Sequence, residues 1–116
     1  MSEPVLAMDV RHPSDGTAVI DIKGEVTAAC EGVLMSAYDD ANSNNAKLIV
    51  LNFDALDYMN SGGIGMLVTL LVRANRQHQK LAAYGLSDHY RQIFQITRIA
   101  DFMTIFDDET AAVSAS

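Results

Sequence analysis

The chain is poor in several residue types, and each shortage excludes a class of protein. Its 116 residues include one Cys, two Pro and no Trp. A single Cys cannot form an internal disulfide, which excludes a disulfide-stabilised secreted domain and favours a reducing, cytoplasmic compartment. That residue, Cys30, lies in a predicted helix, where we expect a small buried side chain.

Basic residues and long apolar runs are scarce as well. The chain has 8 Lys and Arg against 15 Asp and Glu, and the net charge of −7 argues against nucleic acid or an anionic membrane as a partner. The longest strongly apolar stretch, residues 64–72, is far shorter than the roughly 20 residues that span a bilayer. The N-terminal segment lacks the charged and apolar regions of a signal peptide. We therefore expect a cytoplasmic protein with no membrane partner.

Apolar residues, in contrast, are plentiful enough for one hydrophobic core. They make up 49% of the chain, and the length is typical of a single domain, which we place over residues 1–116. The charges are unevenly distributed: residues 73–98 carry a net charge of +4, whereas the rest of the chain carries −11. The basic residues of this sector are Arg73, Arg76, Lys80, Arg91 and Arg98. Our hypothesis is that part of this sector steers an oppositely charged partner.

Apolar periodicity predicts an initial hairpin followed by alternating helices and strands. The predicted strands are residues 5–10, 17–26, 47–53, 81–84 and 103–106. The predicted helices are residues 27–42, 62–77, 88–96 and 108–113, with Thr27 and Ser87 as N-caps of the first and third. A turn is predicted at 12–16, a helix-ending polar segment at 42–45 and a loop at 54–61.

This order, β-β-α-β-α-β-α-β-(α), predicts an α/β fold. Strands that are joined through helices should pair in parallel with right-handed crossovers, whereas the first two strands should pair antiparallel. The apolar and polar residues alternate in those first two strands, which indicates that helices cover mostly one face of a mixed, mainly parallel sheet. We therefore expect a single-layer α/β sandwich in preference to a doubly wound sheet.

Motifs of common enzymes and metal sites are missing. The sequence has no phosphate-binding P-loop, no zinc-binding Cys/His spacing and no nucleophile elbow. The three histidines, His12, His78 and His89, are too widely spaced to indicate a metal site. Neither an enzymatic activity nor a cofactor is predicted.

One segment, residues 56–65 (LDYMNSGGIG), has the composition and position of a functional loop. It joins a predicted buried strand to a predicted helix, which is where ligands and reactive groups gather in open α/β sheets. Free N–H groups at the start of that helix would stabilise an anion, including a phosphoryl group. Asn60 or Ser61 should cap the helix, and we expect the glycines, including Gly65, to allow a strand to approach closely.

This loop resembles the signature of a known family. Residues 57–65 (DYMNSGGIG) are similar to the loop of STAS domains, the fold of bacterial anti-sigma factor antagonists, in which an aromatic residue and Met or Ile precede Asp, Ser, Ser/Thr and a Gly-Leu-Gly or Gly-Ile-Gly. The predicted order of elements resembles the STAS order over essentially the whole chain. Residues 24–27 (GEVT) also resemble the Gly-Glu-Leu-Asp that ends the second strand of that family.

The resemblance implies a regulatory protein without enzymatic activity. In the family, the antagonist binds an anti-sigma factor that is also a serine kinase, and thereby releases a sigma factor. Phosphorylation of the Ser or Thr before the Gly-Leu-Gly adds a charge of about −1.5 to −2 and breaks the complex. On this chain, the family Asp falls on Asn60, the first Ser on Ser61 and the phosphoacceptor on Gly62, while Thr27 replaces another Asp.

These departures leave two interpretations of the switch open. Ser61 is the only hydroxyl in the turn, so either the phosphorylation site has moved to Ser61 or the protein binds its partner without phosphorylation control. The predicted partner-binding residues are Glu25, Thr27, Asn60, Ser61, Gly62, Gly63, Met66 and Leu70. For the last two, packing against neighbouring helices is the alternative.

Three other functions are alternatives to this one. A STAS scaffold or adaptor independent of phosphorylation, as in stressosome-like assemblies or the cytoplasmic tails of anion transporters, is the alternative within the family. A receiver-like domain would use Asp54 or Asp57 as its phosphoacceptor, but it lacks the acid pair and the lysine that such domains place after their first and last strands. A small enzyme with Ser61 as nucleophile has no histidine placed by the sequence to activate it.

Overall fold

The structure, a computed structural model, describes residues 6–43 and 45–114, which form one five-stranded sheet in the order β1-β2-β3-β4-β5. The first two strands, β1 (Leu6–Ser14) and β2 (Thr17–Val26), form an antiparallel hairpin. Each remaining neighbour pairs in parallel, which adds β3 (Leu48–Met59), β4 (Lys80–Tyr84) and β5 (Thr104–Phe106). The mixed, mainly parallel sheet that the sequence predicts is confirmed.

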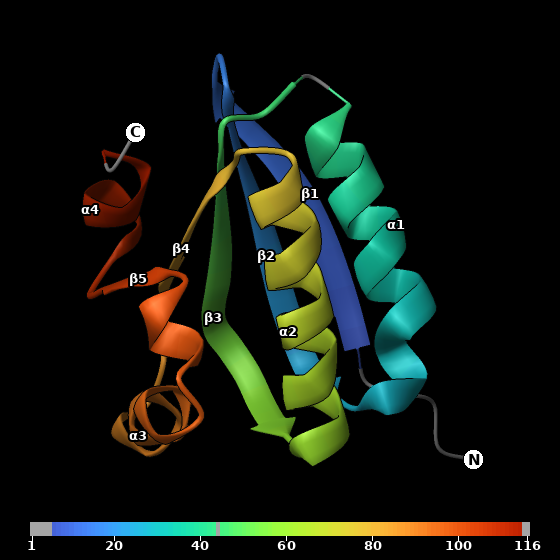
Figure 1. The fold of residues 1–116 in the computed structure, drawn as a ribbon, viewed down its shortest axis with the longest axis vertical. Helices are drawn as coiled ribbons and strands as arrows, with labels where there is room; N and C mark the ends of the chain where they lie inside the picture. The colour runs from blue at the N-terminus through green and yellow to red at the C-terminus, as the bar shows by residue number, and fades with distance from the viewer. Residues whose placement is uncertain (1–5, 44, 115–116) are drawn as a thin grey trace.

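The helices lie mostly on one face of this sheet, as predicted. Figure 1 shows α1 (Glu31–Asn42) and α2 (Ser61–Arg76) beside each other along the sheet, with α3 (Asp88–Ile96) at one end. The short helix α4 (Glu109–Val113) packs on the opposite face, against β3, β4 and β5. Two 3₁₀ turns complete the elements: η1 (Ala28–Cys30) precedes α1, and η2 (Ile99–Asp101) follows α3.

Most of these helices begin with an N-cap residue whose short polar side chain accepts a hydrogen bond from a backbone N–H. The Thr27 hydroxyl accepts a hydrogen bond from the Ala29 N–H, and the Ser87 hydroxyl accepts one from the Tyr90 N–H. Asp108 caps α4 in the same way. Because an N-cap oxygen satisfies a backbone N–H that has no partner inside the helix, each such cap stabilises its helix by about 1 kcal/mol. Ser87 caps α3 as predicted, whereas Thr27 caps η1 and not α1, which begins at Glu31 without a side-chain cap.

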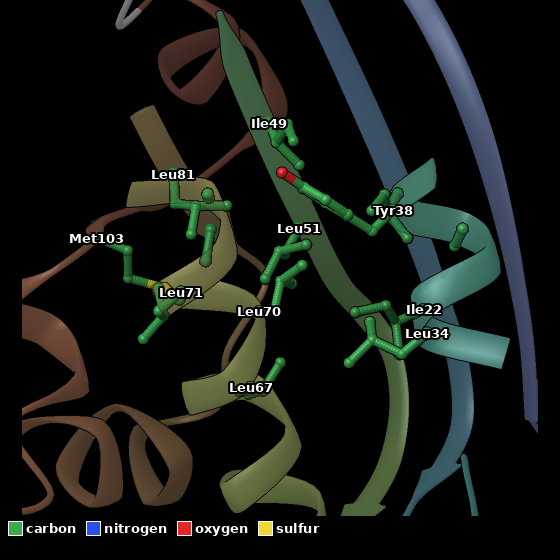
Figure 2. Close-up of a cluster of buried hydrophobic side chains, with 14 of the residues drawn as sticks. Ile22, Leu34, Tyr38, Ile49, Leu51, Leu67, Leu70, Leu71, Leu81 and Met103 are labelled. Carbon is green, nitrogen blue, oxygen red and sulfur yellow. The ribbon is translucent and has the colours of Figure 1, made fainter. Parts of the chain in front are cut away.

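The main core lies between the sheet and helices α1 and α2. Figure 2 shows Leu67 and Leu70 of α2 directed toward Leu51 of β3, with Ile22 of β2 and Leu34 of α1 beside them. All five side chains are almost completely buried. Full burial of one such side chain stabilises the fold by roughly 1.5–3 kcal/mol, so this layer fixes α2, and with it the loop at its start, relative to the sheet.

Two of the strands, β1 and β3, continue beyond the C-terminal ends that the sequence predicts for them. The first strand reaches Ser14, so the reversal is confined to Asp15 and Gly16; its predicted first residue, Val5, lies outside the described residues. The predicted polar segment 42–45 ends α1 at Asn42, and Asn44 within it lies outside the described residues as well.

The larger correction concerns residues 54–59, which are strand and not loop. The last part of β2 pairs with them in parallel: Gly24 lies opposite Leu56, Glu25 opposite Tyr58, and Val26 opposite Met59. One register shift lies before these pairs, between Asp21 and Lys23, and a second lies among them, between Gly24 and Glu25. Because this half of β3 contains exposed acidic residues, its composition is that of a loop. Pairing with β2 nevertheless holds its backbone in an extended conformation.

Candidate functional site

The candidate site lies where β3 ends and α2 begins, beside the end of β2. Asn60 has an extended backbone, and its N–H donates to the Val26 carbonyl at 3.2 Å. Its side-chain Oδ1 accepts from the Gly63 N–H at 2.9 Å, and its carbonyl accepts from the Ile64 N–H at 3.0 Å. Asn60 therefore anchors the turn to β2 and caps α2. Asn and Asp are about equally good N-caps, so an Asp at this position could hold the same geometry of the turn.

The glycines of this turn are required because η1 and the end of β2 approach it closely. A Cβ atom on Gly63 would overlap the Val26 carbonyl oxygen. A Cβ atom on Gly62 would lie 2.9 Å from the Cβ of Ala28. Close packing is thus the reason for both residues. Gly65 differs, because a Cβ there would meet nothing within 4 Å, so the prediction that a strand approaches Gly65 is wrong.

The exposed side chains around the turn come from three segments. Ser61 is exposed at the first position of α2. Glu25 is exposed near the end of β2, and Tyr58, its partner across the parallel pair, is 50% exposed on β3. The sequence analysis assigned no role to Tyr58. Tyr58 occupies the aromatic position of the signature loop, and this position was the signal that could have identified it. In the structure, its half-exposed side chain beside the turn is unusual for a residue that only packs.

Two side chains near the turn, those of Cys30 and Tyr90, serve mainly to hold it in place through hydrogen bonds. The half-buried Thr27 donates its N–H to the Cys30 Sγ at 3.5 Å, and that Sγ lies 3.5 Å from the Glu25 carbonyl, to which it donates. The hydroxyl of Tyr90 on α3 accepts from the Met59 N–H at 2.9 Å. Cys30 is buried, as predicted. These contacts tie η1 and α3 to the ends of β2 and β3.

Two predicted partner-binding residues are not on the surface. Met66 is 7% exposed and Leu70 is fully buried, and both belong to the main core. Because α2 is apolar on more than one side, the sequence did not show which side faces the sheet. The prediction that these two residues contact a partner is therefore wrong, and the alternative, packing inside the molecule, is correct. The exposed apolar residues of α2 are Val68 and Val72.

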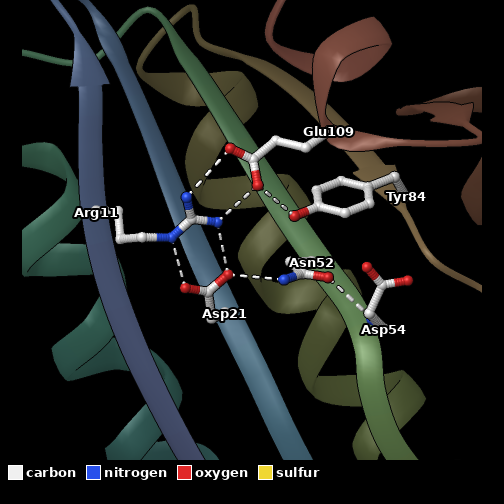
Figure 3. A network of polar contacts seen from close by, with 6 residues as sticks. All are labelled: Arg11, Asp21, Asn52, Asp54, Tyr84 and Glu109. Carbon is white, nitrogen blue, oxygen red and sulfur yellow. Dashed lines mark hydrogen bonds and ion pairs between the residues drawn. The ribbon is translucent and has the colours of Figure 1, made fainter.

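A polar network occupies the other face of the sheet (Figure 3). The Arg11 guanidinium donates to Asp21 at 2.6 Å and to Glu109 of α4 at 2.9 Å. The Tyr84 hydroxyl donates to Glu109 at 2.7 Å, and Asn52 donates to Asp21 at 2.7 Å. The network joins β1, β2, β3 and β4 to the last helix, and lies on the face opposite the main core.

The charges in this network shift the pKa values of its members. The hydrogen bonds from Arg11 lower the pKa of Asp21 and are also the main cause of the lowered pKa of Glu109. Burial, followed by the hydrogen bond to Glu109, raises the pKa of Tyr84. These shifts follow from burial and from pairing within a network that fastens α4 to the sheet, so we assign the network a structural role.

The remaining candidate residues do not assemble into a chemical site. Among residues 6–43 and 45–114, no three His, Cys, Asp or Glu side chains gather as metal ligands would. Asp54 lies within β3, where its N–H donates to the Asn52 side chain. The sheet order β1-β2-β3-β4-β5, with its antiparallel first pair, also differs from the parallel 2-1-3-4-5 order of receiver-like domains. The receiver-like alternative is therefore wrong.

Within the described part of the chain, no helix has the length and apolar character to cross a membrane.

The fold and the turn together define a class: a mixed sheet with helices mostly on one face, and a capped, glycine-rich junction between the third strand and the second helix. The chain belongs to the STAS domain family, whose model matches residues 8–112. Among curated relatives, the anti-sigma-B factor antagonist of Staphylococcus aureus (strain NCTC 8325 / PS 47) is 26% identical over 86 residues, which cover 74% of this chain and 80% of that protein.

Solved structures share the fold. An anti-sigma factor antagonist from Mycobacterium paratuberculosis superposes with a TM-score of 0.81 at 15% identity, covering 98% of this chain and 96% of that one. The Bacillus cell fate determinant SpoIIAA in its phosphorylated form superposes with a TM-score of 0.67 at 20% identity, covering 95% of this chain and 100% of that one. At these identities the likeness concerns the fold.

Proposed function

We propose that this protein is a non-enzymatic anti-sigma factor antagonist, which binds an anti-sigma factor and thereby releases a sigma factor. The observation that carries the proposal is the turn at the start of α2, where the Asn60 cap and two close-packed glycines present Ser61 to solvent. The curated relatives named as anti-sigma-B factor antagonists support the same role.

The proposed contact surface consists of Glu25, Tyr58, Ser61 and Gly62. Tyr58 offers a large apolar ring with a polar tip, a side chain that is enriched at the energetic centres of interfaces. Glu25 beside it supplies a negative charge for a basic partner group. Gly62 has no side chain, so a partner can approach its backbone. Asn60, Gly63 and Thr27 act through the shape of the turn, because their polar groups or close contacts are used inside the molecule.

We further propose that Ser61 is the regulatory phosphorylation site. Ser61 is exposed, and Gly62, at the family's acceptor position, has no hydroxyl. A phosphate on Ser61 would lie at the N-terminus of α2, where the N–H groups of the first turn and the helix dipole favour negative charge. It would add a charge of about −1.5 to −2 to a contact surface that also contains Glu25. Desolvation of this added charge on binding would oppose formation of the complex.

Binding to the anti-sigma factors of the host, each expressed singly, tests the main proposal. A stable complex with one of them, and release of its sigma factor on addition of this chain, are expected. Glu25→Lys should weaken that complex at least tenfold, whereas the matched reversal Asp40→Lys on the exposed end of α1 should leave it unchanged. Failure to bind any of them, or equal effects of the two reversals, would overturn the proposal and favour the scaffold or adaptor alternative.

Incubation with the bound partner and ATP tests the role of Ser61. Intact mass should increase by one phosphoryl group, and Ser61→Ala should abolish the increase, while Ser87→Ala, which alters another exposed serine, should not. A complex that forms without any phosphorylation would show that this protein acts without a phosphorylation switch.

A further inference from the structure

A second surface feature, remote from the Ser61 turn, is an apolar groove between α2 and η2. Its volume is about 310 Å³. One wall is the C-terminal half of α2, and the other is formed by the end of α3, η2 and the residue after it. The groove is lined by Val68, Leu71, Val72, Asn75, Arg76, Thr97, Arg98, Ile99 and Phe102.

The groove exposes apolar side chains that a folded domain normally buries. Val68 is 44% exposed, Val72 46% and Phe102 67%, and these are three of the six large apolar residues that are clearly exposed in the described part of the chain. Clustering of this kind marks an interaction surface, because water contact with each such side chain is unfavourable. The two valines are four residues apart, so they form one continuous ridge along α2.

Local structure holds Phe102 in this position. Arg98 adopts a left-handed backbone conformation with φ of 69°, which reverses the chain after α3. Its Nε donates to the Asp101 carboxylate at 2.6 Å, closing the η2 turn. The Phe102 N–H then donates to the Ile99 carbonyl at 3.0 Å, while the Ile99 side chain is buried in the core. The outer wall of the groove is thus built by a defined turn anchored at Ile99.

The charge around the groove is positive in a chain that is otherwise acidic. Arg76 and Arg98 form its rim, and Arg73 precedes Arg76 by one turn of α2. Among the described residues, neither Arg73 nor Arg76 forms an ion pair. Part of this charge offsets the C-terminal dipole of α2, but residues 73–98 still carry a net charge of +4 against −11 elsewhere. A carboxylate-bearing partner would be attracted here and repelled elsewhere.

The shape of the groove distinguishes between a protein segment and a small amphiphile. Small-molecule sites enclose 70% or more of their ligand. Here Val68, Val72 and Phe102 are 44%, 46% and 67% exposed above the buried Leu71 and Ile99, so the groove is open along these three side chains. An amphipathic helix instead lays one apolar row into an open groove and keeps its polar flanks in solvent. Carboxylates on those flanks would meet Arg76, since the Arg98 guanidinium already pairs with Asp101.

We propose that this groove docks an acidic amphipathic helix of another protein. Val72 lies eleven residues after Ser61 on the same helix, which separates the two surfaces by about 16 Å along its axis. The two surfaces are therefore distinct. The Ser61 surface would engage one partner while the groove holds the other.

Two synthetic helical peptides with the same row of leucines at i, i+3, i+4 and i+7 test the proposal. One carries glutamate on its flanks and the other lysine, and each is titrated into the full ¹⁵N-labelled chain. We expect the glutamate peptide to shift the amide signals of residues 68–76 and 97–102, to bind at least tenfold more tightly than the lysine peptide, and to weaken with added salt.

Substitutions then show which residue determines the preference for the glutamate peptide. Arg76→Glu, a change at an exposed residue, should reduce or reverse the preference for the glutamate peptide, with the fold verified by circular dichroism. Ser61→Ala should leave binding unchanged, so this test stands apart from the proposed antagonist function. Equal binding of both peptides, signal shifts outside the groove, or shifts at the same residues with dodecanoate alone would overturn the proposal, and the last result would assign the groove to a small amphiphile.

Discussion

Ala28 and Gly62 pack so closely that a Cβ atom on Gly62 would lie 2.9 Å from the Cβ of Ala28. The contact joins the η1 turn, which follows β2, to the first turn of α2. The contact occupies the space that a side chain at position 62 would need. The methyl group of Ala28 and the absence of a side chain at Gly62 therefore belong to one packing arrangement.

We predict that Gly62→Ser destabilises the protein by about 1–3 kcal/mol, because the new Cβ requires η1 to move away from α2. Urea unfolding measures the change. The double variant Ala28→Gly with Gly62→Ser should recover part of the loss, since Ala28→Gly removes the opposing methyl group. Additive effects of the two substitutions in the double-mutant cycle would show that this contact does not determine the residue at position 62.

The cap of α2 gives a second prediction. Asn60→Ala should lower the free energy of unfolding by about 1 kcal/mol, because the Gly63 N–H loses its acceptor. Asn60→Asp should retain wild-type stability, since the carboxylate can accept the same hydrogen bond and also favours the helix dipole. Thermal unfolding of the three proteins measures the difference. An equal loss in both variants would contradict the cap as the main role of Asn60.

A third prediction separates the buried and exposed faces of α2. Leu70→Ala should destabilise the protein by about 2–5 kcal/mol, because it leaves a cavity in the main core. Val68→Ala, on the same helix but in the groove, should cost less than about 1 kcal/mol because its side chain is already 44% exposed. Chemical denaturation compares the two. Similar losses would mean that the groove side of α2 is packed as tightly as the core.

The local features of this fold could be predicted from the sequence, and the features that depend on distant partners could not. Thr27 and Ser87 cap helices through contacts within three residues, so their chemistry is visible in the sequence. The strand over 54–59, in contrast, exists because residues 24–26 pair with it, and nothing in its own exposed acids shows that pairing. Its composition alone therefore predicted a loop.

The same limit applied to the candidate site. The signature loop located the turn, the Asn60 cap and Ser61, because these lie within one short segment. The position of Ala28 against Gly62, and the pairing that places Tyr58 beside Glu25, required the three-dimensional arrangement of β2, η1 and β3. The burial of Leu70 depended on which side of an apolar helix meets the sheet, a choice that the sequence left open.

The Arg11 network, whose ends lie 98 residues apart, leads to a prediction about pH. Arg11 lowers the pKa of Asp21 and Glu109 in the folded state below their ordinary values of 3.8 and 4.5. A carboxylate with a lowered folded pKa stabilises the protein fully above its unfolded pKa, and this contribution is lost as the pH falls through the folded value. Arg11→Met should therefore cost about 1 kcal/mol near neutral pH, a value kept modest by solvent exposure of the pair.

The pH dependence of that loss distinguishes electrostatics from packing. Urea midpoints of wild type and Arg11→Met should differ most near neutral pH and converge below about pH 4, as both carboxylates become protonated in the unfolded and then the folded state. Arg91→Met is the matched control, because Arg91 pairs with Asp107, a carboxylate that is 90% exposed, and should change stability little at any pH. A loss for Arg11→Met that stays constant down to about pH 3 would mean that the aliphatic part of Arg11, and not its charge, holds α4 against the sheet.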